Sequence, residues 1–287
     1  MPRAARELFH PTLRTQWLGH QLREIRKRSG RSLADAALYL NYDPSYLARC
    51  ERAEWPFRQD HLNMLLDFYQ VNDGDLRARL VADLAASWQL NVFDMGGSIH
   101  TNRSVSLTWL EGRAETIYLY AVLVVPGLLQ TRDYAHATMR FYGDPDEGAE
   151  RWVDLRIGRQ QILDRSAPVR LSAVIDETAL RYPIAEPATM RAQLTHLMTM
   201  NRRPGVEVRV LPAGTRRPDG AGGPFAVIRL PKPYPSVAYL ENLAGSFYLE
   251  GPRSRKFVDA YDQIRRSALP AGESAKRITQ IIEEEWS

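Results

Sequence analysis

The chain has 287 residues, 44% of them hydrophobic and 25% charged, which is typical of folded proteins and of a length that suits two domains. Its longest apolar run, residues 117–129, is too short to span a bilayer and is interrupted by Pro126 and Gly127. The single cysteine, Cys50, excludes an intramolecular disulfide and any zinc site built from several cysteines. The N-terminus lacks the apolar segment of a secretory signal, so we expect a cytoplasmic protein.

The net charge of +4 is unevenly distributed along the chain. Residues 1–58 contain eleven Lys and Arg against six Asp and Glu, whereas the remaining residues contain 27 and 28. A local basic excess favours a polyanionic partner, because neutralised phosphates release bound counterions. The same excess is equally expected of a solvated surface, so charge alone does not decide between the two.

Five helical segments are predicted after an N-terminal arm of residues 1–15, and together they form an all-α domain over residues 16–88. The segments cover residues 16–28, 32–40, 43–52, 60–69 and 73–88. In the first segment, apolar residues recur at the spacing of one helix face, which places Arg26 on the outward side.

Start signals mark the second and third segments. Ser32 is a favourable N-cap with Asp35 three residues later, and Asp43 precedes a proline at the first helical position. Between the two helices, Asn41 tolerates the left-handed backbone of a sharp turn. Two short helices joined by three residues match a helix-turn-helix, whose second helix enters the major groove of DNA.

The outward positions of the third helix are the candidate base-contacting residues, and the start of the second helix is a candidate phosphate clamp. The predicted DNA-binding residues are Arg31, Ser32, Ser45, Tyr46, Arg49 and Arg52. Paired hydrogen bonds from Arg49 suit a guanine. The alternatives are that the arginines are only solvated and that Tyr46 packs on a neighbouring helix. Cys50 is expected to fill the core.

Residues 32–37, Ser-Leu-Ala-Asp-Ala-Ala, and residues 41–52, Asn-Tyr-Asp-Pro-Ser-Tyr-Leu-Ala-Arg-Cys-Glu-Arg, resemble the Cro/repressor-type (XRE) helix-turn-helix. The resemblance implies that this segment binds DNA. Three residues depart from the family pattern: Leu33 replaces a polar residue that contacts phosphate, and Asn41 and Ala53 replace glycines. Asn41 adopts a positive φ easily, whereas Ala53 does so with more strain.

A linker, residues 89–107, precedes a second domain over residues 108–287. Helices are predicted over residues 108–120, 131–141, 144–163, 187–201, 252–268 and 271–286. Strands are predicted over residues 169–176, 206–211, 225–230, 237–241 and 246–249, the last two as a hairpin. The fold class is therefore α+β: an all-α domain of five helices, then a domain with a mostly antiparallel sheet and flanking helices.

Short motifs of this second domain resemble a known family of regulators. The most specific is Val-Pro-Gly-Leu-Leu-Gln-Thr at residues 125–131, and the others lie at residues 110–111, 134–135, 159–163, 176–177, 239–241 and 248–250. They are similar to the actinobacterial WhiJ-type regulators, which join an XRE head to a large C-terminal domain described as antitoxin-like. The resemblance covers nearly the whole chain beyond residue 15. It implies a transcriptional regulator with a small partner protein encoded nearby.

Four polar residues within apolar stretches of the second domain are candidates for contact with a ligand or a partner protein: Glu111, Gln130, Arg159 and Gln160. If they are buried, they require hydrogen-bond partners. The alternative, which we favour, is an internal polar network that joins the helices.

The sequence contains no pattern typical of an enzyme. Its six histidines never fall at a metal-binding spacing, and no Gly-x-Ser-x-Gly motif occurs. The glycine-rich residues 218–224 lack the Lys-Ser/Thr of a phosphate-binding loop. We therefore predict no catalytic residue, no metal and no cofactor.

Together these observations predict a dimeric, sequence-specific DNA-binding transcriptional regulator whose C-terminal domain senses a small molecule or a small partner protein. The first alternative is an antitoxin-like protein-interaction module that retains a vestigial DNA-binding head. An enzyme built on the C-terminal domain is a weaker alternative.

Overall fold

The computed structural model describes residues 13–87, 107–142, 149–217, 222–242 and 245–287. The chain divides into two compact units, Met1–Val92 and Phe93–Ser287. The predicted N-terminal arm and the predicted linker lie almost wholly outside the described residues. In the described part of the chain, every helix is too short or too polar to cross a membrane.

Over its described residues, 13–87, the N-terminal unit is all-α, as the sequence predicts. Its helices are α2 (Leu13–Arg28), α3 (Leu33–Tyr39), α4 (Pro44–Glu51), α5 (Gln59–Phe68) and α6 (Gly74–Ser87). The predicted capping box starts α3: the Ser32 hydroxyl accepts a hydrogen bond from the Asp35 amide, and the Asp35 carboxylate accepts one from the Ser32 amide. Asp43 caps α4 by accepting a 2.7 Å hydrogen bond from the Ser45 amide. Both predicted helix starts are therefore confirmed.

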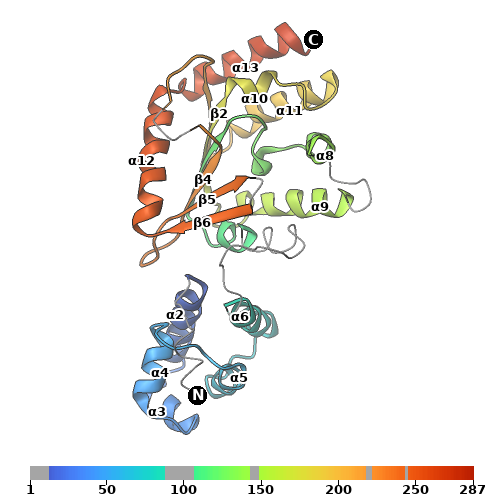
Figure 1. The fold of residues 1–287 in the computed structure, drawn as a ribbon. Coiled ribbons are helices and arrows are strands. Elements are labelled where there is room, and N and C mark those ends of the chain that lie inside the picture. The colour runs from blue at the N-terminus through green and yellow to red at the C-terminus, as the bar shows by residue number, and fades with distance from the viewer. Residues whose placement is uncertain (1–12, 88–106, 143–148, 218–221, 243–244) are drawn as a thin grey trace. The chain divides into compact units, whose positions relative to one another are not determined.

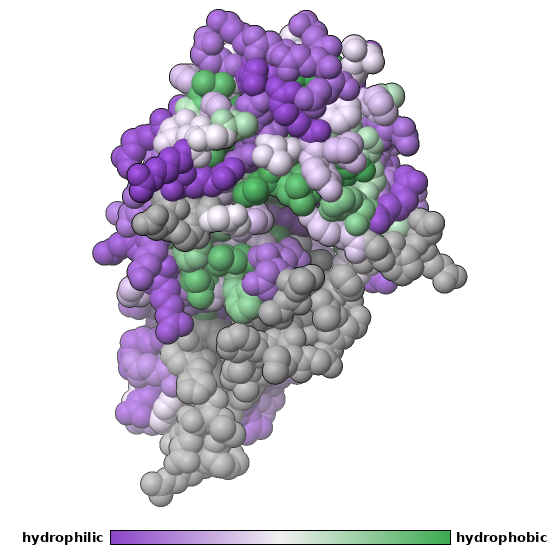
Figure 2. Space-filling model, turned by 45° about the horizontal axis from the view of Figure 1, so that its top comes forward, coloured by the Kyte–Doolittle hydropathy of each residue, from purple (hydrophilic) through white to green (hydrophobic). Residues whose placement is uncertain are grey.

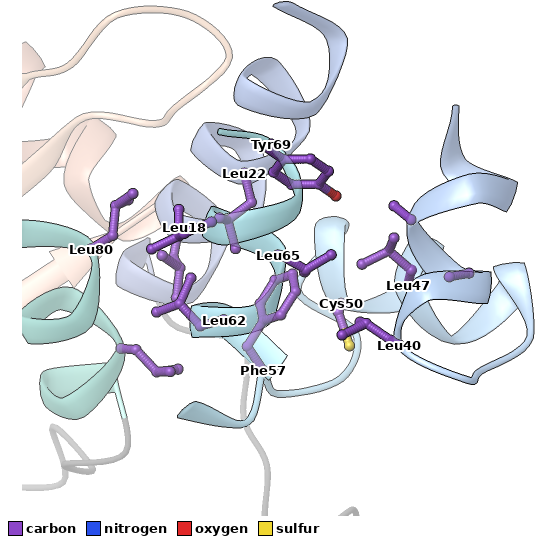
Figure 3. Close-up of a cluster of buried hydrophobic side chains, with 14 of the residues drawn as sticks. Leu18, Leu22, Leu40, Leu47, Cys50, Phe57, Leu62, Leu65, Tyr69 and Leu80 are labelled. Carbon is purple, nitrogen blue, oxygen red and sulfur yellow. The ribbon is translucent and has the colours of Figure 1, made fainter. Parts of the chain in front are cut away.

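The core of the N-terminal unit is made largely of leucines. Figure 3 shows side chains from α2, α4, α5 and α6 converging, among them Leu18, Leu47, Leu65 and Leu80. Cys50 lies within this core, as predicted, and burial raises the pKa of its thiol to about 12. The thiol therefore fills space in the core and lacks the exposure and the low pKa of a reactive cysteine.

The C-terminal unit is built on one mixed sheet. Its strands are β1 (Thr116–Ala121), β2 (Arg170–Asp176), β3 (Val206–Leu211), β4 (Phe225–Arg229), β5 (Val237–Asn242) and β6 (Gly245–Glu250), in the spatial order β3-β2-β1-β4-β5-β6. β1 pairs in parallel with β2, and β2 in parallel with β3. The remaining pairings are antiparallel, including the predicted hairpin of β5 and β6. The α+β class is confirmed.

Helices cover both faces of this sheet. Besides a short helix at residues 107–111, the described helical elements are η1 (Gly127–Leu129), α8 (Arg132–Phe141), α9 (Ala149–Arg159), η2 (Gln160–Leu163), α10 (Glu177–Arg181), α11 (Pro187–Met200), α12 (Pro252–Ser267) and α13 (Ala271–Glu285). Figure 1 shows α12 on one side of the sheet and α8 and α9 on the other. On the α12 side, Tyr261 packs in one cluster with Tyr120, Val174 and Val227 from three neighbouring strands.

The predicted helix over residues 108–120 is wrong. Residues 107–111 are helical, the chain then turns, and Thr116–Ala121 forms β1. The sequence Thr-Ile-Tyr-Leu-Tyr-Ala is rich in β-branched and aromatic residues, which fit a pleated, half-buried strand better than a helix. Because β1 joins the parallel and antiparallel halves of the sheet, missing it also hid the parallel pairings.

Candidate nucleic-acid interface

α3 and α4 form the predicted helix-turn-helix. Ala36 and Ala37 are fully buried, and their small side chains let neighbouring helices approach closely. The chain turns through Asn41, whose φ is 58°, and leaves α4 through Ala53, whose φ is 55°. Ala53 therefore adopts the left-handed backbone that favours glycine, at a cost on the order of 1–2 kcal/mol.

α2 anchors the end of α4. A Cβ placed on Gly19 would stand 2.6 Å from the carbonyl oxygen of Glu51, so only glycine fits this approach. The buried Glu51 carboxylate accepts hydrogen bonds of 2.7 and 2.9 Å from Arg26, and these raise the pKa of Arg26. The prediction that Arg26 points outward is wrong. The Arg26 side chain is buried and, through Glu51, holds the end of α4 in place.

The outer side of α4 carries an exposed polar stripe. Ser45, Arg49 and Arg52 are exposed and follow one another at intervals of four and three residues, which places them on one helix face. A helix in the major groove presents one such face to the base edges. The structure therefore brings three of the four predicted α4 residues together on a surface suited to DNA.

The two arginines of this stripe have different surroundings. The Arg49 guanidinium lies over the Trp55 ring, 4.5 Å from its centroid, and no described carboxylate accepts a hydrogen bond from it. Arg52 instead donates two hydrogen bonds to Glu54, of 2.7 and 3.1 Å, and both side chains are about half exposed. Among the described residues, Arg49 therefore makes no side-chain hydrogen bond that DNA would have to replace. Arg52 would have to break its hydrogen bonds to Glu54 before it could bind DNA.

Tyr46 does not belong to the exposed stripe, and its predicted outward position is wrong. The side chain is 6% exposed and stacks on Tyr42 with ring centroids 4.3 Å apart. Its hydroxyl shares a 2.9 Å hydrogen bond with Nδ1 of His61 in α5, and burial raises the pKa of Tyr46. The ring joins α4 to α5 within the unit.

Arg31 and Ser32 are both exposed at the start of α3. The Arg31 guanidinium lies over the Phe68 ring, 4.6 Å from its centroid. The Ser32 side chain is occupied in the helix cap, with its hydroxyl 2.6 Å from an oxygen of Asp35. A cation beside an exposed helix start suits a phosphate more than a base edge.

Sequence reasoning missed the residues that support this surface. Trp55 lies under Arg49, Glu54 pairs with Arg52, and Glu51 holds the end of α4. Trp55 and Glu54 carry a usable signal, because an acidic and an aromatic residue within three residues of a basic helix end can reach its side chains. The pairing of Glu51 with a residue of α2 is long-range and leaves no such local trace.

A second polar cluster contains the candidate ligand residues of the C-terminal unit. Arg159 donates two hydrogen bonds of 2.7 Å to the carboxylate of Glu111, which is 3% exposed. Burial disfavours the charged guanidinium, but its interactions with Glu111 outweigh this and raise the pKa of Arg159. The pair joins the end of helix 107–111 to α9.

The two candidate glutamines hold the loop around η1. Gln130 is buried; its amide nitrogen donates to the carbonyl of Val125 at 2.8 Å, and its amide oxygen accepts from Arg156 at 2.9 Å. Gln160 donates to the carbonyls of Gly127 and Gln130, at 3.1 and 2.8 Å. All four candidate ligand residues therefore have partners inside the unit, as in the internal network that we favour from the sequence.

Within the described residues, no group of three or more His, Cys, Asp or Glu side chains is arranged to hold a metal ion. The adjacent carboxylates Asp176 and Glu177 at the end of β2 have structural partners. Asp176 caps α10 through the Thr178 amide and contacts Arg217, while Glu177 binds Arg181 and Arg277.

The comparisons with known proteins agree with this geometry. A family model described as a helix-turn-helix domain matches residues 17–80, the part of the chain that contains α3 and α4. This part of the chain is thus a helix-turn-helix domain, which supports a DNA-binding regulator. A second model, a domain of unknown function named DUF5753, matches residues 105–280, which is more than half of the chain, and the chain belongs to this family. The searches of curated proteins and of solved structures found no match to this chain.

Proposed function

We propose that the protein is a sequence-specific transcriptional regulator that binds DNA as a homodimer and places α4 of each copy in the major groove. The observation that carries the proposal is the exposed stripe of Ser45, Arg49 and Arg52, on a helix whose other side is fixed to α2 and α5. A rigid support suits base recognition, since side chains on a fixed helix lose less freedom on binding. Two copies would contact half-sites about one helical turn apart.

Binding of promoter duplexes at several salt concentrations tests this proposal. The double variant Arg49→Ala, Arg52→Ala is expected to weaken binding strongly and to reduce the slope of log affinity against log salt by about one for each phosphate that the two arginines neutralise. The matched control is Arg255→Ala, Arg266→Ala, which removes the same charge from exposed positions of α12. Equal weakening by the two double variants would show that α4 is not the DNA-contacting element.

For the C-terminal unit we propose a regulatory role and no catalytic activity. The resemblance to WhiJ-type, antitoxin-like domains supports control by a small molecule or by a small protein encoded nearby. Exposed aromatic rings are consistent with such contacts: Phe141 packs edge-on against both Tyr142 and Tyr182, and all three are at least 38% exposed. Figure 2 shows hydrophobic residues gathered beside a hollow on one side of the molecule.

Footprinting on the DNA upstream of the protein's own gene, with and without the neighbouring small proteins, tests the regulatory role. The expected result is a footprint whose occupancy changes when a partner or effector is present. A footprint that no neighbouring protein or cell metabolite fraction alters would contradict the proposed role of this unit while leaving DNA binding intact.

A further inference from the structure

The contact between Arg49 and Trp55 sets Arg49 apart from the other exposed residues of α4. A guanidinium lying over the face of an indole is held by cation–π attraction. The side chain therefore has fewer conformations to lose when it binds. The fork of donors on Arg52 instead faces the carboxylate of Glu54.

Trp55 is itself fixed in place. It is partly buried, packs against the core of the N-terminal unit, and contacts the Tyr46 ring with centroids 5.9 Å apart. Tyr46 is in turn held by its hydrogen bond to His61 of α5. A continuous series of packed rings thus connects the core to the exposed guanidinium of Arg49.

The N–H groups of a guanidinium lie in one plane and form a fixed fork of donors, and contact with the ring beneath restricts where the Arg49 fork can lie. Arginine in this state can donate two parallel hydrogen bonds to O6 and N7 of guanine, the most frequent specific contact in the major groove. We propose that Trp55 is a positioning residue that holds Arg49 for paired hydrogen bonds to one guanine in each half-site. The inference rests on the proposed function, since it requires α4 to enter the groove.

Arg31 provides an internal comparison. Its guanidinium lies over Phe68 at almost the same distance, 4.6 Å from the centroid against 4.5 Å for Arg49 and Trp55. It is located at the start of α3, however, where a phosphate is the expected partner, and phosphate contacts carry no base information. Removal of the Phe68 ring should therefore weaken binding to all duplexes, while removal of the Trp55 ring should change which duplexes are preferred.

Selection of duplexes from a randomised library tests the proposal. The wild-type protein is expected to enrich a guanine at one position of each half-site, and Arg49→Ala to reduce that enrichment by roughly 5- to 100-fold. Trp55→Leu should reduce it by about 2- to 10-fold, because the freed side chain must be ordered on binding. Trp55→Phe keeps an aromatic face and should restore most of it, and Phe68→Leu should leave it unchanged.

The outcomes distinguish the inference from the proposed function. If Trp55→Leu weakens all duplexes equally and the guanine preference persists, Trp55 only supports the fold and the inference is wrong, although the proposed function stands. If Arg49→Ala alters the salt dependence but not the base preference, Arg49 contacts phosphate and the inference is again wrong. If the wild-type protein binds no duplex, the proposed function fails as well. Thermal unfolding of each variant shows whether it is folded, and Trp55→Phe provides a conservative change at the same position.

Discussion

The two units of this protein use arginine in different ways. On α4, Arg49 and Arg52 are exposed, with an aromatic ring beside one and an exposed acid beside the other. In the C-terminal unit, Arg159 is paired with the buried carboxylate of Glu111. An arginine that lies beside an exposed acid or a ring remains available to a partner, whereas one paired with a buried carboxylate holds the fold together. Exposure and pairing, rather than residue type, distinguish the candidate binding residues.

The largest expected effect is on the buried pair of the C-terminal unit. Arg159→Ala leaves the Glu111 carboxylate buried without a partner, and we expect it to lower the free energy of unfolding of this unit by about 3–5 kcal/mol. Hydrogen exchange of the β1 and β2 amides in increasing denaturant measures this. Arg49→Ala, which removes an exposed arginine, should change stability by no more than about 0.5 kcal/mol. Similar destabilisation by the two variants would contradict the comparison.

A second prediction concerns the support behind α4. Gly19→Ala would place a Cβ against backbone atoms at the end of α4, and we expect it to destabilise the N-terminal unit by about 1–3 kcal/mol. Gly74→Ala is the matched control, since a Cβ there meets nothing within 4 Å. It should be neutral or stabilising by up to about 1 kcal/mol. Thermal unfolding compares the two, and a neutral Gly19→Ala would show that α2 does not fix α4.

The C-terminal unit should also lose stability in acid through Glu207. Burial opposes ionisation of this carboxyl, but hydrogen bonds from Arg265, Ser172 and Arg209 lower its pKa to about 2. Because the pKa is lower in the folded state, the stabilisation is complete above about pH 5 and is lost as the pH falls toward 2. After allowance for its partial exposure, we expect a contribution on the order of 1–2 kcal/mol.

Denaturant unfolding at a series of pH values measures this contribution. Glu207→Gln should flatten the acid limb of the stability curve, whereas Glu273→Gln, which removes an exposed acid paired with Lys276 on α13, should leave the curve unchanged. An acid limb that is the same in wild type and Glu207→Gln would show that the three hydrogen bonds do not stabilise the charged form.

The smallest expected effect is on DNA affinity. Glu54→Gln removes the carboxylate that pairs with Arg52, so Arg52 no longer has to break this pair to bind DNA. We expect DNA binding to become tighter by only about two- to fourfold, because an exposed ion pair is weak. Asp60→Asn is the control: it removes the same charge from a similar exposed pair, with Arg58, at the start of α5. If both variants tighten binding equally, the gain reflects net charge and Arg52 has no particular role.

Local signals predict the N-terminal unit well. Caps at Ser32 and Asp43 determine where α3 and α4 begin, and both are visible in the sequence because capping depends on residues within one helical turn. The two errors there, Arg26 and Tyr46, have one cause. Helical periodicity assigns a face to each residue, but a buried partner distant in sequence can draw a polar side chain inward, as Glu51 and His61 do.

The C-terminal unit is less predictable because its order depends on long-range pairing. Composition identifies the strands from β2 onward but not β1, since a short apolar segment after a helix fits either periodicity. Without β1 the sheet lacks the strand that joins its two halves. Arg159, which pairs with Glu111, lies 48 residues away, and Arg156, one of the partners of Gln130, lies 26 residues away. These distances exceed any local pattern, so the sequence predicts that the two residues need partners but does not identify them.

Protection of a single introduced thiol tests most directly whether α4 meets DNA. Cys50 is buried and the pKa of its thiol is raised, so it should react slowly with an alkylating reagent. Ser45→Cys adds a thiol at an exposed position of α4, and this thiol should react much faster. We expect a saturating amount of selected duplex to slow alkylation of this variant by at least about tenfold, because a thiol in the groove is covered. Alkylation of Ser267→Cys, at an exposed position of α12, should not change. Equal alkylation of Ser45→Cys with and without bound duplex would contradict the account.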